Sequence, residues 1–436
     1  MNKKLWSLFS VLLIAAMMLV ACGPSAAPTE APAATEAPVV TEAPVVTEAP
    51  AATEAPSGEV QTISIWHQWS GDYFTAIEQA FKDYEAANPG IKIDLSKPDD
   101  VQNALQTAIP AGEGPDIIAW ANDHIGDLSL LGIISPLDGY GITQDFLTST
   151  YEPAAVNGVM LNDQIWALPE TQEGIALLYN KALVTEEYLL TDPTDLNDLL
   201  AKAEKFQADK GIPLICNQGF GGVDAYHVAP VYFGFGVPEY VDSEGNAYMN
   251  TPEALAAAEW LQKFSKFSFA ESSYDICNAA FQEGKVGAWW TGPWAVANVQ
   301  DAGIDLGILP VGRPFVGIKT LMLSTNAEAR GNAEAALDVI KYFTSADVQK
   351  KLALVNKTIP APSVALADPE VAADPVINGF GASLNLGVPM ANHPYAAAQW
   401  TPVGDASLAV WQGKQAPQEA MDAAQAAIEE AVAGMK

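Results

Sequence analysis

The chain has 436 residues, which is more than one ordinary hydrophobic core encloses, so we expect two domains. Acidic residues outnumber basic residues by 53 to 21, and the formal net charge at pH 7 is -32. This charge argues against binding to nucleic acid or to anionic lipid headgroups, because both need clusters of Lys and Arg. With 49% hydrophobic residues, the chain is expected to form packed globular structure.

The first 22 residues have the pattern of a secretory signal peptide. Lys3 and Lys4 precede an apolar run over residues 5–20, which is short for a transmembrane span. The run ends in Leu-Val-Ala followed by Cys22, which looks like a lipobox, in which the cysteine is lipidated and becomes the new N-terminus. We therefore predict a signal peptide over residues 1–22 and lipidation of Cys22; an ordinary signal peptide or an uncleaved anchor is the alternative.

Residues 23–58 are of low complexity. The sequence Thr-Glu-Ala-Pro recurs with a period of six from Thr29, Thr35, Thr41, Thr47 and Thr53. No large side chain is present to offset the entropy cost of ordering the segment, and regular prolines favour extended polyproline II. At about 3.1 Å per residue, such a segment reaches on the order of 100 Å. We interpret it as a disordered tether between a lipid anchor and a folded body; a wall-binding or glycosylated stalk is the alternative.

Strands and helices are predicted to alternate from residue 60 onward. Residues 60–66 alternate as a strand does, and residues 73–87 carry Phe74, Ile77, Phe81 and Tyr84 on one helical face. Further strands are predicted over residues 91–95, 116–119, 175–179, 213–216, 286–290 and 321–324. Further helices are predicted over residues 101–109, 195–210, 252–267, 333–343 and 346–355, and another begins at Trp294. This alternation predicts α/β domains with doubly wound sheets.

One predicted strand leads directly into polar side chains. After the turn at Gly114-Pro115, an apolar run ends in Trp120, Asn122, Asp123 and His124. These residues can stack on a polar ligand or hydrogen-bond to it, and open α/β sheets build their sites where strands end. The alternative is a strand that ends in a polar loop beside a core tryptophan.

Several of the 11 tryptophans stand beside turns or polar residues: Trp66, Trp69, Trp120, Trp294 and Trp400. Indole faces stack on the apolar C–H face of a sugar ring, and carboxylates or amides bind its hydroxyls. Each of these tryptophans has core packing as its alternative, and at least one of Trp289 and Trp290, inside a predicted strand, is expected in the core. Both His67 and His124 are candidate hydroxyl partners or solvated loop residues.

The sequence resembles the maltose/maltodextrin-binding proteins of bacterial ABC importers over roughly residues 59–430. The resemblance rests on the stretch from Gly114 to Asp123 and on further matches in order: Phe81-Lys82-Asp83-Tyr84-Glu85, Leu178-Tyr179-Asn180-Lys181, Ala280-Phe281, Gly292-Pro293-Trp294-Ala295, Pro314-Phe315-Val316-Gly317 and Gln399-Trp400. It implies the two-lobe periplasmic-binding-protein fold (type II), with several crossings at a hinge and a ligand cleft between the lobes. Lobe 1 would comprise residues 59–171 and 313–362, and lobe 2 residues 172–312 and 363–436.

The resemblance also implies site residues. Trp120 and Asp123 match a cleft tryptophan and a hydroxyl-binding aspartate, Glu173 a cleft glutamate, and Trp294 and Trp400 two stacking aromatics. Tyr226 is the candidate for a stacking tyrosine, although residues 219–222 disturb the local alignment. Trp66, Ser70 and His124 complete the expected ligand-binding set. The family can have an aspartate–lysine pair at Ser70 and Gly71 and arginines at His124 and Gly404, so which sugar is bound stays open.

No metal or cofactor is expected. The four histidines lack metal-ligand spacing, and no Cys-x-x-Cys, phosphate loop or dinucleotide fingerprint occurs. Cys216 and Cys277 remain besides Cys22, and a disulfide between them is possible outside the cytoplasm, although sequence alone does not place them within reach.

The leading hypothesis is a monomeric, extracytoplasmic lipoprotein that is not an enzyme. It would bind maltose or a maltodextrin between its lobes and deliver it to the membrane subunits of an ABC permease. The first alternative is a secreted glycoside hydrolase acting on α-glucans, with Asp123 and Glu173 as its carboxylate pair. The second is a receptor-coupled sensor with the same cleft and no role in transport.

Overall fold

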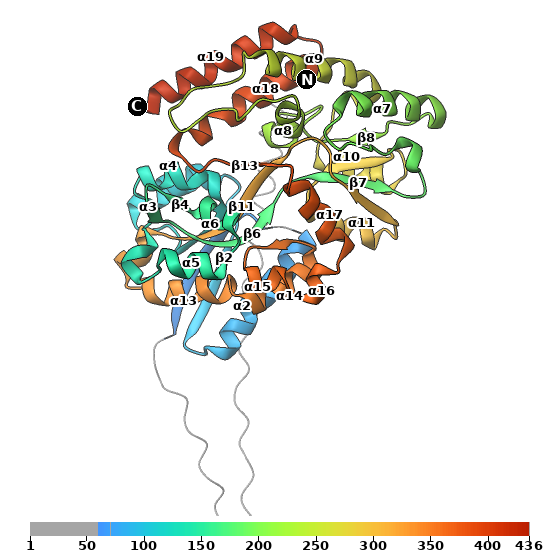
Figure 1. Ribbon diagram of the computed structural model, residues 1–436. Coiled ribbons are helices and arrows are strands. Elements are labelled where there is room, and N and C mark those ends of the chain that lie inside the picture. The colour runs from blue at the N-terminus through green and yellow to red at the C-terminus, as the bar shows by residue number, and fades with distance from the viewer. Residues whose placement is uncertain (1–59, 70, 436) are drawn as a thin grey trace, which may run out of the picture. The chain divides into compact units, whose positions relative to one another are not determined.

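The structure is a computed structural model that describes residues 60–69 and 71–435 (Figure 1). The predicted signal peptide, the lipidation site Cys22, the tether and Ser70 lie outside the described residues. The described residues belong to one compact unit. Within them, no helix is both long enough and apolar enough to cross a membrane.

Within the described chain, the larger sheet has seven strands in the order β12-β6-β11-β3-β1-β2, with β13 beside β11. Their bounds are β1 Gln61–His67, β2 Ile91–Ser96, β3 Ile117–Ala121, β6 Leu168–Glu173, β11 Phe315–Leu323, β12 Ile359–Pro360 and β13 Val388–Pro389. Strand β1 pairs in parallel with β2 and β3, whereas β11 runs antiparallel to β3 and β6. This first sheet is therefore mixed rather than wholly parallel.

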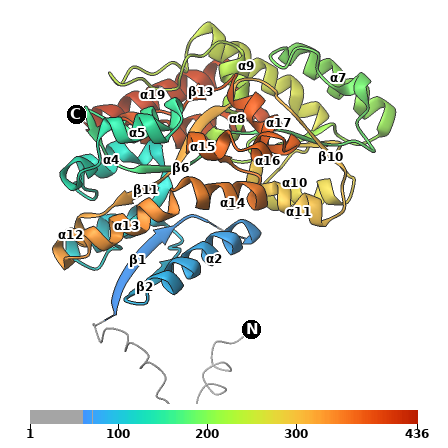
Figure 2. The same cartoon turned by 60° about the horizontal axis from the view of Figure 1, so that its bottom comes forward.

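A first hydrophobic core lies against this sheet. Ile63 and Ile65 of β1 are fully buried in it, as the alternating pattern predicts, and Ile77 and Phe81 of α2 pack with them. Helices α2, α13 and α14 lie side by side (Figure 2). The helices of this part are α2 Gly71–Ala87, α3 Val101–Ala111, α4 Ile125–Leu130, α5 Gln144–Thr150, α6 Pro153–Val159, α12 Thr325–Arg330, α13 Ala333–Phe343 and α14 Ala346–Asn356. A short hairpin joins β4 Met160–Leu161 to β5 Gln164–Ile165.

The second sheet has four strands among the described residues, in the order β10-β7-β9-β8. Their bounds are β7 Ala176–Asn180, β8 Ile215–Cys216, β9 Ala288–Thr291 and β10 Leu306–Leu309. Helices lie on both faces: α7 Leu196–Lys210, α8 Ala225–Gly234, α9 Pro252–Phe264, α10 Tyr274–Gln282, α11 Val296–Asp301, α17 Pro375–Leu384, α18 Trp400–Trp411 and α19 Pro417–Met435. The short helices α15 Ser363–Leu366 and α16 Pro369–Ala372 lie against α14 instead. Side chains alternate across β9, so Trp289 enters the core on one face and Trp290 the core on the other. Both tryptophans are fully buried, which confirms the expected core role.

A disulfide joins Cys216 at the end of β8 to Cys277 in α10, with their Cα atoms 5.5 Å apart. The sequence alone did not decide whether these two cysteines form a disulfide. The bond closes a loop of 61 residues and fixes α10 against the second sheet.

Strand β6 is the main element that the sequence did not reveal. Residues 170–174 read as a polar crossing, yet all six residues of β6 are buried between β11 and β12. The chain passes from the first sheet to the second directly after Glu173. At Gly174 a Cβ atom would lie 2.6 Å from the Phe315 carbonyl oxygen and 2.4 Å from a Leu384 methyl, so this crossing needs a glycine.

Strand β11 carries the chain back. Phe315 at its start packs in the core of the second sheet, whereas Ile318 and Leu321 pack in the first core. We predicted a crossing between the lobes at residues 313–317 and a separate strand at residues 321–324. In the structure, most of both ranges belong to the single strand β11. Strand β11 thus runs from a core of the second sheet to the first core, and its middle lies beside both.

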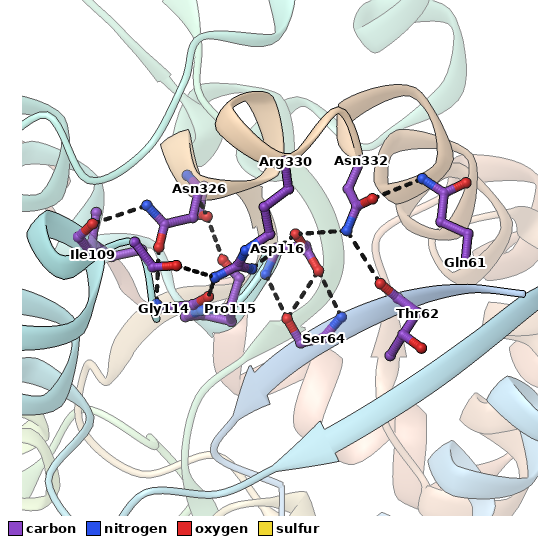
Figure 3. A network of polar contacts seen from close by, with 12 residues as sticks. Gln61, Thr62, Ser64, Ile109, Gly114, Pro115, Asp116, Asn326, Arg330 and Asn332 are labelled. Atoms are coloured by element: carbon purple, nitrogen blue, oxygen red, sulfur yellow. Dashed lines mark hydrogen bonds and ion pairs between the residues drawn. The ribbon is translucent and has the colours of Figure 1, made fainter. Parts of the chain in front are cut away.

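The Gly114-Pro115-Asp116 motif ends in a structural aspartate (Figure 3). Asp116 is buried at the start of β3 and accepts hydrogen bonds from the Ser64 backbone N–H and hydroxyl, both at 2.9 Å. Its other oxygen accepts from Arg330 at 3.1 Å and from Asn332 at 3.2 Å. One carboxylate therefore joins β1, β3 and the region of α12 and α13.

Candidate ligand-binding site

A cavity of about 710 Å³ is lined by residues of the first sheet and by residues of helices and turns that pack with the second. The lining residues are Gln68, Trp69, Tyr73, Ala119, Trp120, Ala121, Asp123, His124, Glu170, Glu173, Tyr226, Tyr274, Trp294, Ala297, Asn298, Gly317, Ile318, Lys319, Met390 and Trp400. This volume is in the range of small-molecule sites in proteins. The charged residues of the lining all come from strands of the first sheet or from the turn after β3, whereas Tyr226, Tyr274, Trp294 and Trp400 pack with the second.

The end of β3 supplies one polar group of the wall. Trp120 is the fourth residue of β3, and the 3-10 turn η1, Asn122–His124, follows at once. The His124 ring stacks on the Trp120 indole with centroids 3.6 Å apart. Asn122 anchors the turn, because its amide donates to the Met390 carbonyl at 3.0 Å and accepts from the Ile318 N–H at 2.9 Å. The turn thus holds Asp123 and His124 at the cavity.

Asp123 and His124 influence each other's charge. The His124 Nε2 lies 3.6 Å from Asp123 Oδ2, and the His124 Nδ1 lies 3.8 Å from Asp127 Oδ2. Burial raises the pKa of Asp123, and the neighbouring His124 only partly offsets this. Burial by itself would lower the pKa of His124, but the Asp123 and Asp127 carboxylates outweigh it and raise that pKa. The protonated imidazole is thereby favoured beside the carboxylate.

A second polar group comes from β6, β11 and the start of α2. Lys319 Nζ lies 2.9 Å from Glu173 Oε1 and 4.2 Å from the centroid of the Tyr73 ring. The Tyr73 hydroxyl donates to Glu170 at 3.4 Å, and the Trp69 indole N–H donates to Glu170 at 3.2 Å. Lys319 gives this group a positive charge next to two carboxyls.

Of these carboxyls, Glu170 has the least favourable surroundings for a negative charge. It is buried, and this burial raises its pKa to about 7, although the Lys319 charge opposes the shift. Burial likewise raises the pKa of Tyr73 well above its usual value, with the Glu170 and Glu173 charges adding to it. Tyr73 therefore stays a neutral hydrogen-bond donor.

The opposite wall is aromatic. Trp294 follows Gly292-Pro293 in the turn η5, Pro293–Ala295, and its ring lies so close to the Gly292 backbone that a Cβ there would be 2.2 Å from ring atoms. Tyr226 lies beside Trp294, with ring centroids 6.5 Å apart, and stacks on Phe315 at 5.9 Å. With Tyr274 and Trp400 these side chains form the aromatic wall, which has no charged residue among the described lining residues; the charged wall, from the first sheet and its adjoining turns and helix, also contains Trp69, Tyr73 and Trp120.

One hydrogen bond crosses the cavity between the two parts of the molecule. The Trp400 indole N–H, at the start of α18, donates to Asp123 Oδ2 at 3.0 Å. Trp400 packs against the second core, whereas Asp123 belongs to the turn after β3. The bond fixes one oxygen of the Asp123 carboxylate.

The structure brings seven of the nine expected ligand-binding residues to the cavity: Trp120, Asp123, His124, Glu173, Tyr226, Trp294 and Trp400. Ser70 lies outside the described residues. Trp66 is not among the lining residues; it is half-buried in β1 and packs against the first core.

His67 is neither a hydroxyl partner nor a solvated loop residue. It is buried at the end of β1 between Trp69 and Phe74, with ring centroids 5.0 and 4.7 Å apart. Burial, with the Lys97 charge, lowers its pKa to about 4, so the ring is neutral at pH 7. Gly404 packs against the loop at Val223 and Asp224, where a Cβ would lie 2.9 Å from a Val223 methyl.

Sequence reasoning missed several lining residues, chiefly Tyr73, Glu170, Lys319, Tyr274 and Asn298. Tyr73 and Lys319 lie inside regular elements, where no local pattern separates them from ordinary helix and strand residues. A Pro-Glu-Thr-Gln-Glu run that is polar yet directly precedes an apolar strand was the available signal for Glu170. Among the described residues, no group of three or more His, Cys, Asp or Glu side chains is placed to hold a metal ion.

Residues 79–379 match the model of a family described as bacterial extracellular solute-binding protein. This chain belongs to that family. The solute-binding protein is 30% identical over 354 residues to the maltotriose-binding protein of Pyrococcus abyssi, an alignment covering 78% of this chain and 75% of the relative. It is 26% identical over 338 residues to the galactooligosaccharide-binding protein of Bacillus subtilis, covering 72% and 76%. The family and these relatives are binding proteins rather than enzymes, and the family is extracellular.

Solved structures show the same fold. The maltose/maltodextrin-binding domain of Bdellovibrio bacteriovorus bound to maltotriose superposes with a TM-score of 0.75 at 24% identity, covering 85% of this chain and 99% of that one. The Thermus thermophilus maltotriose-binding protein gives a TM-score of 0.72 at 22% identity, covering 85% and 100%. The solute-binding protein therefore has the two-lobe periplasmic-binding-protein fold that was expected.

Proposed function

We propose that this solute-binding protein binds a maltodextrin-type oligosaccharide in the cavity and delivers it to an ABC permease. The observation that carries the proposal is the division of the cavity into an aromatic wall and a charged wall. Trp294 and Trp400 offer stacking faces, and Asp123, Glu173 and Lys319 offer hydrogen-bond partners. A sugar ring has an apolar face and a rim of hydroxyls, so it satisfies both walls at once.

The ligands in the names of the two relatives narrow the class of sugar that we expect this protein to bind. One is named a maltotriose-binding protein and another a galactooligosaccharide-binding protein, so short oligosaccharides are common to both. We favour the maltodextrin type because the relative with the higher identity is the maltotriose binder.

The lobes are proposed to lie where the sequence placed them, at residues 59–171 and 313–362 and at residues 172–312 and 363–436. The first core supports this division, because it draws its residues from 63–168 and 318–361. A core of the second sheet draws on residues 175–315 and 388–432. Lipidation at Cys22 and the repeat tether would hold this monomer at the outer face of the membrane, within reach of the permease.

Binding without hydrolysis is favoured by the state of the two candidate carboxylates. Asp123 is held by the Trp400 N–H and lies beside His124, and Glu173 is ion-paired with Lys319. A retaining or inverting hydrolase needs one carboxyl to carry a proton and the other to be free to attack or to activate water. These partners instead fix both carboxylates as hydrogen-bond acceptors.

Calorimetric titration with maltose, maltotriose, longer maltodextrins and galactooligosaccharides tests the proposal. We expect saturable 1:1 binding of a maltodextrin at micromolar concentration, and the recovered sugar should be of unchanged length. Binding of galactooligosaccharides alone, or of none of these sugars, would contradict the assignment of the ligand, and shortened products would revive the hydrolase.

A further inference from the structure

Lys319 holds an unusual position in the cavity wall. Among the described lining residues it is the one lysine or arginine, and its side chain is 25% exposed. Its ammonium contacts the Glu173 carboxylate at 2.9 Å and the face of the Tyr73 ring at 4.2 Å. An ion pair that only stabilises the fold can lie anywhere in the protein, so the position of this pair in the cavity wall indicates a role in binding a ligand.

Strand register explains why the pair faces the cavity. In the pairing of β6 with β11, Gly317 stands opposite Glu173 and Lys319 opposite Thr171. Residues two apart on a strand share a face, so Lys319 and Glu173 are diagonal neighbours on the same side of the sheet. Gly317 has no side chain to cover the Glu173 carboxylate.

The chemistry of the pair fits sugar hydroxyls. An ammonium has three N–H donors and no acceptor, and a carboxylate only accepts. The Lys319 ammonium donates to the Glu173 carboxylate on one side and contacts the face of the Tyr73 ring on another. It therefore keeps an N–H donor for a ligand. A hydroxyl both donates and accepts, so of two neighbouring hydroxyls one can accept from Lys319 while the other donates to Glu173. Because the two charges compensate each other, a neutral ligand leaves no buried charge unpaired.

We propose that Lys319 is a specificity-determining residue, which together with Glu173 binds two neighbouring hydroxyls of one sugar ring. The site therefore takes a neutral sugar with both hydroxyls intact at this position and discriminates against analogues that lack either one. This inference rests on the proposed function, since it names the groups of the sugar that the same cavity recognises. It assigns to β11 a role that neither the motifs nor the relatives' names indicate.

The test compares Lys319→Met with a matched control, Lys357→Met. Lys357 also forms a partly buried ion pair, at 2.8 Å with Asp374, and its side chain is 21% exposed, but it is not among the residues that line the cavity. Both variants lose one charge and one ion pair. We expect Lys319→Met to bind maltotriose roughly 10- to 100-fold more weakly, as for loss of a hydrogen bond to a charged group, and Lys357→Met to bind like wild type. Equal affinities of Lys319→Met and wild type would overturn the proposal.

A series of monodeoxy maltotrioses gives a second readout, of which the measurements on the wild-type protein do not depend on how the variant folds. On the wild-type protein, removal of one hydroxyl of the neighbouring pair should weaken binding, and this penalty should disappear in Lys319→Met. If no single deoxygenation weakens binding to wild type, or if Lys319→Met keeps the full penalty, the proposal is wrong. Failure of wild type to bind maltotriose at all would instead contradict the proposed function.

Discussion

Trp400 contributes both an aromatic face and an N–H donor to the cavity. Its indole N–H donates to the buried Asp123 carboxylate at 3.0 Å. This bond orients Asp123, so that its other oxygen is set for a ligand hydroxyl. The two contributions can be separated, because phenylalanine keeps an aromatic face and lacks the donor.

We predict that Trp400→Phe weakens maltotriose binding roughly tenfold, since Asp123 loses a hydrogen bond to its charged group. Trp400→Ala should bind more weakly still, because it also loses the stacking face. Calorimetric titration measures both. Trp411→Phe is the control, since it removes a similar N–H bond, at 3.1 Å to the Phe269 carbonyl, outside the cavity. Unchanged affinity in Trp400→Phe would show that this hydrogen bond does not orient Asp123 for binding.

Glu170 should make the stability of the protein depend on pH. Its pKa is raised from the usual 4.5 to about 7 in the folded state by burial, so the folded protein holds this proton more tightly than the unfolded chain does. The stability gained from protonation is complete below pH 4.5 and is lost as pH rises through 7. Ionisation of Glu170 then costs the fold about 3 kcal/mol.

Glu170→Gln removes that cost and keeps an acceptor for the Trp69 N–H. We predict that the variant is more stable than wild type at pH 8, by up to about 3 kcal/mol, and that the difference shrinks toward pH 5. Urea unfolding at both pH values measures it. A difference that is independent of pH would mean that Glu170 does not titrate in this range.

The sequence indicated which residues lie at the cavity where a local pattern marks them. Trp120 stands near the end of a buried strand, Asp123 follows that strand, and Trp294 follows a Gly-Pro turn, so their positions along the chain mark them as candidates. Lys319 carries no such mark and Glu170 only the polar run around it, because the register of β11 on β6 is what brings them to the cavity. Trp66 was expected at the cavity and does not line it, since the strand pattern does not show which face of the sheet the cavity lies on.

The elements were predicted most accurately where an amphipathic pattern or a cap marks them. Helix α13 has the predicted bounds, Ala333–Phe343, and α9 begins at Pro252 after the Thr251 cap, as expected. Strand β6 was missed because Pro, Glu, Thr and Gln have low strand propensity or polar side chains. Its burial depends on strands that join it from residues 315–323 and 359–360, which no local window contains.

The junction at Asp116 should be critical for the first sheet. Its carboxylate is buried and accepts from Ser64 of β1 and from Arg330 and Asn332 of the α12–α13 region (Figure 3). We predict that Asp116→Ala lowers the free energy of unfolding by about 3 kcal/mol, because it leaves these donors without their acceptor.

Chemical denaturation measures this loss, and maltotriose titration of the folded variant provides the control. Asp116 lies at the start of β3, away from the strand end that lines the cavity, so affinity should stay within about twofold of wild type. A loss of stability below about 1 kcal/mol would contradict the central place given to this carboxylate.

The described part of the molecule has a first sheet with one core and a second sheet with a core on each face, and the chain passes between the sheets after β6 and again through β11. The charged wall belongs to the first sheet and the aromatic wall to elements packed with the second, so a sugar that contacts both favours the closed arrangement. The Trp400–Asp123 hydrogen bond is a contact of this kind. Such an arrangement suits a protein that captures a ligand and releases it to a partner.

A crystal structure of the protein with maltotriose tests this account most directly. We predict glucose rings stacked on Trp294 and Trp400, with hydroxyls hydrogen-bonded to Asp123, Glu173 and Lys319. Maltotriose bound outside this cavity, or bound within it through one wall alone, would contradict the claim that the two walls together recognise the sugar.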